Sequence, residues 1–73
     1  MADIVVRSPV AGTVWKIEAA VGDALAADAE IMILESMKME VPVTAPEGGT
    51  LVELLVDEEG VIAEGQDVAV IRP

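Results

Sequence analysis

Short runs of β-branched and other apolar residues recur along the whole chain, separated by turn residues. Seven of these runs predict strands, at residues 4–6, 13–17, 31–34, 41–43, 50–56, 61–62 and 68–71. Glycine, proline and acidic residues fill the gaps between them, as expected for turns. The alanine-rich stretch 24–30 is the one place where one or two turns of helix are expected. The pattern therefore predicts a single all-β domain with short strands.

The second half of the chain repeats the first after a shift of 37 residues, without a gap. The identical pairs are Val6 and Val43, Pro9 and Pro46, Gly12 and Gly49, Thr13 and Thr50, and Ala26 and Ala63. Two valine-rich stretches could align through composition alone. The shared Pro-x-x-Gly-Thr-apolar turn, followed by strands in register, favours a duplication instead. A duplication predicts a pseudo-twofold body made of two equivalent four-strand units.

The midpoint of this repeat falls at Met37-Lys38, between two predicted strands. We expect a tight hairpin there, with these two residues as its loop. The twofold then maps the hairpin onto the chain termini. Residues 68–72 should lie beside residues 2–6, at the edge of the molecule farthest from Lys38.

This hairpin breaks two local rules. Two-residue loops require positive φ and prefer Asn-Gly or Asp-Gly, and a non-glycine residue there costs about 1 kcal/mol or more. In the expected register Ser36 faces Met39 and Glu35 faces Glu40, and like charges placed opposite each other destabilise a strand pair. Such conflicts cluster at functional sites. An ordinary surface turn with an exposed lysine remains the alternative.

The composition removes several classes of function. The 73 residues contain no His, Cys, Tyr or Phe, which excludes Cys–His metal sites, catalytic triads and imidazole bases. Four basic and fourteen acidic residues give a net charge of -10, which argues against nucleic acid and anionic membranes as partners. No apolar run is long enough to span a bilayer, no signal peptide is evident, and the lack of cysteine favours a cytoplasmic location. A hydrophobic content of 53% nevertheless predicts a folded core.

Residues 35–40, Glu-Ser-Met-Lys-Met-Glu, resemble the attachment motif of biotinyl domains, usually Ala-Met-Lys-Met after an acidic residue. The turns 9–12 and 46–49 look like the two paired turns of that family. The resemblance covers the whole chain, so residues 1–73 are expected to form one biotinyl domain. It implies a flattened eight-strand barrel, a barrel-sandwich hybrid. Because the halves align without a gap, the chain is more similar to the compact domains without a protruding thumb.

The resemblance also implies the function of a biotin carboxyl carrier. Lys38 would be biotinylated by a biotin protein ligase. The attached biotin would carry carboxylate from a biotin carboxylase to a carboxyltransferase, in an acyl-CoA or pyruvate carboxylase type of complex. We therefore expect a carrier rather than an enzyme, with biotin as cofactor, no metal, and no nucleic-acid or membrane partner. Two alternatives remain: a lipoyl carrier, whose tip is typically Asp-Lys-Ala without flanking methionines, and an unmodified β interaction module.

The residues beside the lysine form an expected recognition hairpin. They are Glu35, Ser36, Met37, Met39 and Glu40. The two methionines are predicted to be contact surfaces for the ligase and the carboxylase rather than core, and the glutamates either mark the lysine or are ordinary acidic surface. Ser36 replaces the commoner alanine and is small enough for the same position. Lys16 is expected to be a solvated strand residue, and Met32 and Trp15 to be core. The loops at 22–23 and 59–60 are expected to differ in detail.

Overall fold

The computed structural model describes residues 2–73, and this part of the chain contains eight strands and no helix. The strands are β1 (Ile4–Arg7), β2 (Gly12–Ile17), β3 (Ala24–Leu25), β4 (Glu30–Ser36), β5 (Met39–Thr44), β6 (Gly49–Leu54), β7 (Val61–Ile62) and β8 (Asp67–Arg72). Every predicted strand is present, although β6 ends at Leu54 rather than at residue 56. Between residues 2 and 73, therefore, no helix is available that could cross a membrane.

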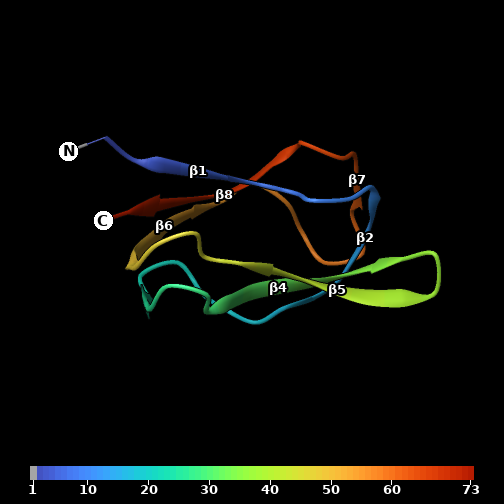
Figure 1. The fold of residues 1–73 in the computed structure, drawn as a ribbon, viewed down its shortest axis with the longest axis horizontal. Helices are drawn as coiled ribbons and strands as arrows, with labels where there is room; N and C mark the ends of the chain where they lie inside the picture. The colour runs from blue at the N-terminus through green and yellow to red at the C-terminus, as the bar shows by residue number, and fades with distance from the viewer. Residues whose placement is uncertain (1) are drawn as a thin grey trace.

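The strands form two antiparallel sheets of four strands each, stacked as two layers (Figure 1). One sheet has the order β1-β8-β6-β3, and the other has the order β5-β4-β2-β7. The predicted all-β barrel-sandwich fold is confirmed. The two sheets are not joined by strand pairing, so the fold is a sandwich rather than a closed barrel. Each sheet takes two strands from each half of the sequence. The two halves are thus interlocked and cannot form separate cores.

The 37-residue repeat is visible in the strands and in their irregularities. A shift of 37 carries β2 onto β6 and β3 onto β7, end to end. The β2–β4 ladder slips between Val14 and Lys16, and the β6–β8 ladder slips at the equivalent place, between Leu51 and Glu53. Such bulges are built-in features of a strand pair rather than defects. Their repetition confirms the predicted pseudo-twofold symmetry.

The loops obey the same symmetry, so the prediction that they differ in detail is wrong for the backbone. Gly22 has a φ of 100° and its counterpart Glu59 a φ of 70°, while Asp28 and Gly65 have 69° and 80°. The amides of Gly22 and Glu59 donate equivalent 2.7 Å hydrogen bonds, to β6 and to β2 respectively. Hydrogen bonding to the opposite strand fixes the loop backbone. A glutamate and an aspartate therefore adopt a conformation that favours glycine.

The alanine-rich stretch is not helical, and the expectation of a helical turn there is wrong. Ala24 and Leu25 form β3, which pairs with Gly49 and Thr50 of β6. A tight turn follows, in which Asp28 has positive φ, a conformation that an α-helix excludes. Alanine is the strongest helix former, but intrinsic propensity is small beside tertiary contacts, and pairing with β6 together with packing of Leu25 against the core overrides it.

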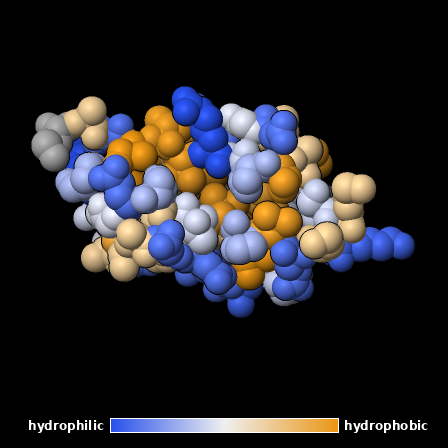
Figure 2. Space-filling view, viewed as in Figure 1, coloured by the Kyte–Doolittle hydropathy of each residue, from blue (hydrophilic) through white to orange (hydrophobic). Residues whose placement is uncertain are grey.

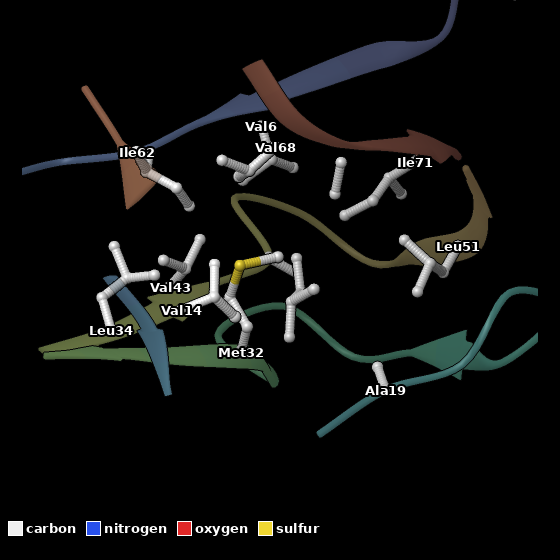
Figure 3. Close-up of a cluster of buried hydrophobic side chains, with 13 residues drawn as sticks. Val6, Val14, Ala19, Met32, Leu34, Val43, Leu51, Ile62, Val68 and Ile71 are labelled. Atoms are coloured by element: carbon white, nitrogen blue, oxygen red, sulfur yellow. The ribbon is translucent and has the colours of Figure 1, made fainter. Parts of the chain in front are cut away.

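The core lies between the two sheets (Figure 3) and consists of thirteen buried apolar side chains. They are Val6, Val14, Ala19, Ile31, Met32, Leu34, Val43, Ala45, Leu51, Ile62, Val68, Ala69 and Ile71. Ten of them are five counterpart pairs related by the shift of 37, such as Leu34 with Ile71. Met32 is completely buried, as predicted. In the described chain, every buried side-chain nitrogen and oxygen has a hydrogen-bond partner.

The hairpin and the termini lie at opposite ends of an elongated body (Figure 1), which measures 36 × 18 × 18 Å. β1 pairs with β8, with Ile4 opposite Ile71. The β4–β5 hairpin projects at the other end of the long axis. This is the placement that the midpoint of the repeat predicts.

Candidate functional site

The β4–β5 hairpin ends in a two-residue loop, Met37-Lys38, as predicted. Met37 has a φ of 52° and Lys38 a φ of 66°, the pair of positive values typical of a type I′ turn. In the strands below the loop, Ser36 lies opposite Met39 and Glu35 lies opposite Glu40. The loop thus holds two non-glycine residues in a conformation that costs each about 1 kcal/mol.

The base of the hairpin is hydrogen-bonded to the turn formed by residues 9–12 and packs closely against it. The Ser36 hydroxyl donates a 2.8 Å hydrogen bond to the carbonyl oxygen of Ala11. A Cβ atom added at Gly12 would lie only 2.5 Å from the carbonyl oxygen of Glu35, so the turn approaches β4 as closely as glycine allows. The sequence pattern indicated only that Ser36 is small. The hydrogen bond to the turn at residues 9–12 was not predicted, because nothing in the local sequence brings that turn next to Ser36.

The side chains of the loop point away from the body. Met37 is 93% exposed and Met39 is 66% exposed, which excludes a core role for either methionine. Figure 2 shows the end of the molecule that carries the β4–β5 hairpin, where pale apolar and blue hydrophilic side chains project beyond the body. Lys38 is exposed, and none of the three ion pairs among residues 2–73 involves it. The hairpin therefore presents a primary amine between two exposed thioethers.

Lys16 has a different environment from Lys38. It lies in the middle of β2, opposite Ile33, and its Nζ is 3.8 Å from Oε1 of Glu18. Lys16 is exposed, which confirms the prediction that it is a solvated strand residue. Of the two lysines, one stands at the tip of a projecting loop and the other lies along the face of a sheet beside a carboxylate.

Trp15 is not a core residue, and that prediction is wrong. Its side chain is 53% exposed, because Val14 points into the core and the next residue of the strand points outward. The bulge between Val14 and Lys16 places Lys16 on the same outer face. The indole lines an open pocket of about 560 Å³. The pocket is lined by Thr13, Val14, Trp15, Glu35, Glu58 and Glu59. The lining residues come from three segments that are distant in sequence, so local sequence patterns could not reveal this pocket.

The hairpin carries the amine of Lys38, two thioethers, two carboxylates and the Ser36 hydroxyl. Residues 2–73 contain no group of three or more His, Cys, Asp or Glu side chains placed to hold a metal ion. The hairpin can present the amine of Lys38 to another protein.

Comparison with known proteins identifies the family. A family model described as Biotin-requiring enzyme matches residues 3–71. The chain belongs to this family. The Biotin/lipoyl attachment protein of Bacillus subtilis is 40% identical to it over 55 residues, which cover 75% of each chain. The Biotinylated protein TB7.3 homolog of Mycobacterium leprae is 35% identical over 66 residues, covering 90% of this chain and 93% of that protein.

A solved structure confirms that this is a biotinyl domain by fold as well as by sequence. The crystal structure of the Kluyveromyces lactis urea carboxylase matches this biotinyl domain with a TM-score of 0.94 and 33% identity. The match covers 99% of this chain but 6% of the urea carboxylase chain. The biotinyl domain thus corresponds to a small part of that carboxylase and to most of the two short relatives.

Proposed function

We propose that this biotinyl domain is a carboxyl carrier that holds biotin through an amide bond to Nζ of Lys38. The position of Lys38 is the observation that carries the proposal: an exposed amine at the tip of a two-residue hairpin, at one end of a rigid body. The residues present fit a covalently attached group. The amine projects into solvent, and the exposed methionines beside it leave it open to another protein.

Attachment requires a ligase, because the domain itself supplies no group to activate a carboxylic acid. Nζ of Lys38 would attack the carboxyl carbon of biotinyl-adenylate in the ligase active site. An amide bond forms, AMP leaves, and the lysine ammonium gives up two protons. The domain contributes the choice of lysine, through the shape of the hairpin and the surfaces of Met37, Met39, Glu35 and Glu40.

Once attached, biotin supplies the capacity to carry a carboxyl group between a biotin carboxylase and a carboxyltransferase. The similarity to urea carboxylase supports a carboxylase complex as the setting, with the acceptor fixed by the partner enzyme. The domain itself contributes the position of the lysine and a negatively charged surface. The sandwich keeps the hairpin rigid, so motion is confined to the lysine arm, and a net charge of -10 favours basic partner faces.

A lipoyl carrier is the second candidate, and one observation favours it. The name of the B. subtilis relative includes both cofactors. The Met-Lys-Met tip favours biotin. The methionines are surface residues here, so core packing does not account for them.

Two ligases distinguish these functions. The purified domain is incubated with ATP and either a biotin protein ligase and biotin, or a lipoate ligase and lipoate, and its intact mass is measured. We expect the mass of one biotinyl group after the first reaction and no change after the second. A lipoyl mass alone would replace the proposed function with the lipoyl carrier. An unchanged mass in both reactions would favour the unmodified interaction module.

A further inference from the structure

The pocket beside Trp15 lies next to the hairpin. Thr13 of β2 pairs with Glu35 of β4, and both residues line the pocket. Glu35 precedes Lys38 by three residues on the strand that leads into the loop. A protein that holds the hairpin and reaches Glu35 would therefore also contact this pocket.

The lining of the pocket suits a cationic side chain. The half-exposed indole of Trp15 offers an aromatic face, over which a guanidinium or ammonium group is attracted. Glu35, Glu58 and Glu59 supply carboxylates, and none of them takes part in an ion pair within residues 2–73. Oε2 of Glu58 accepts a 2.9 Å hydrogen bond from the Ile17 amide, which holds that carboxylate in place.

The twofold provides an internal comparison for this pocket. The counterparts of its lining residues are Thr50, Leu51, Val52, Arg72, Val21 and Gly22. The backbone is the same at both places, yet the tryptophan and all three glutamates are absent from the second. The fold therefore does not require these side chains. Glu59 is the clearest case, because its φ of 70° suits glycine, the residue that its counterpart position contains.

We propose that this pocket receives a basic side chain, arginine or lysine, of the biotin protein ligase while the ligase holds the hairpin. The proposal rests on the proposed function, since it takes the ligase as the enzyme that modifies Lys38. A cation between the indole and the carboxylates would make both contacts at once. It would help the ligase bind the domain, whereas the chemistry at Nζ would be unaffected.

Steady-state biotinylation by a purified biotin protein ligase, with biotin and ATP, tests this. Trp15→Val and Glu59→Gly place the counterpart residue in the pocket. We expect each to raise KM for the domain about fivefold, with kcat within about twofold of the wild type. Trp15→Phe keeps an aromatic face and should recover part of the loss. The wild-type KM should also rise with salt, and the difference between wild type and Glu59→Gly should shrink.

Asp28→Gly is the matched control. It also exchanges an acidic residue at positive φ for glycine. Its loop joins β3 to the start of β4, and this loop lies far from the hairpin (Figure 1). Both glycine variants should be at least as stable as the wild type, so loss of folding cannot explain a raised KM. Asp28→Gly should leave KM unchanged.

Because the chain has a single tryptophan, contact between the ligase and Trp15 can be observed directly. Domain labelled with 5-fluorotryptophan has one fluorine resonance, that of Trp15, and ligase binding should shift it. An unchanged resonance at saturating ligase, wild-type KM values for both pocket variants, or an equal rise in KM for Asp28→Gly would each overturn the proposal. Failure of the wild-type domain to accept biotin would instead overturn the proposed function.

Discussion

The two ends of this molecule share a backbone and differ in charge. At the terminal end, Arg72 donates two hydrogen bonds to Asp3, at 3.0 Å from Nε and 3.1 Å from Nη2. A shift of 37 residues maps Arg72 onto Glu35 and Asp3 onto Glu40. These two glutamates face each other at the base of the lysine hairpin. Equivalent positions thus hold an attractive pair at one end and a repulsive pair at the other.

The packing beneath the two ends is nevertheless equivalent. Gly12 lets its strand approach the carbonyl of Glu35, and Gly49 lets its strand approach the carbonyl of Arg72. Val6 and Val43 are both buried in the core. Because the packing is the same at both ends and the surface charge is not, the fold depends on the repeated apolar and glycine positions. The surface residues at the hairpin end are not needed for the fold, and the facing glutamates there lower the local stability of the strand pair.

The largest expected effect tests whether the packing is truly equivalent. Gly12→Ala and Gly49→Ala place a Cβ atom 2.5 Å and 2.6 Å from a backbone oxygen, so each should lower the free energy of unfolding by about 3 kcal/mol. Urea unfolding of the two variants measures this. Costs that differ by more than about 1.5 kcal/mol would show that the two ends are not mechanically equivalent.

A smaller effect is expected at the hairpin loop, which has no counterpart at the terminal end. Met37→Asn should raise the free energy of unfolding by about 1 kcal/mol, because asparagine tolerates positive φ and the exposed methionine contributes no packing. The same variant should be biotinylated less efficiently, as it lacks one proposed contact surface. A more stable variant with unchanged kcat/KM would remove Met37 from the recognition surface.

The charge contrast itself can be reversed at one position. Glu35→Arg copies the arginine of the terminal end and places it opposite Glu40, so it should stabilise the domain by about 0.5 kcal/mol. Glu53→Arg, at an exposed position on β6, changes the net charge by the same amount and is the matched control. The melting temperatures of both variants are measured in low salt, and a Glu35→Arg variant no more stable than Glu53→Arg would contradict the charge contrast.

The smallest effect concerns pH. The Arg72 guanidinium beside Asp3 lowers the pKa of that carboxyl below its ordinary value of 3.8. A lowered folded-state pKa means that the pair stabilises the fold above the ordinary value and loses this contribution as the pH falls through the folded-state pKa. Asp3→Asn should therefore melt slightly below the wild type at pH 7, and the difference should vanish in strong acid.

The hairpin end should show the opposite sign. At pH 7, Glu40→Gln removes one of two facing carboxylates and should raise the melting temperature slightly, whereas Asp3→Asn should lower it. Both shifts are small because the side chains are exposed. Shifts of the same sign in the two variants would contradict the charge contrast.

Most of the fold was predictable because it follows from repetition. The 37-residue shift predicted the hairpin loop, its register and the pairing of β1 with β8, since each depends on where the symmetric counterparts lie. β3 was missed because a two-residue strand has no alternation of its own, and its alanines suggested helix. Pairing with β6 decided its conformation, and that contact is distant in sequence.

The site was predictable in outline, and the surface around it was not. The position of the hairpin and the exposure of its methionines followed from the sequence. Trp15 was assigned to the core because a single indole whose one basic neighbour is Lys16 gave no sign of a ligand platform. Its other neighbour, Val14, is completely buried, so alternation turns Trp15 outward, and the bulge at residues 14–16 adds Lys16 to the same face. The pocket beside Trp15 could emerge only from the folded chain.

We propose that one end of this symmetric scaffold presents Lys38, and not Lys16, for modification. The most direct test is the intact mass of wild type, Lys38→Arg and Lys16→Arg after exhaustive treatment with a biotin protein ligase, biotin and ATP. We expect one biotinyl group on the wild type and on Lys16→Arg, and none on Lys38→Arg. A biotinyl group retained by Lys38→Arg, or lost from Lys16→Arg, would contradict it.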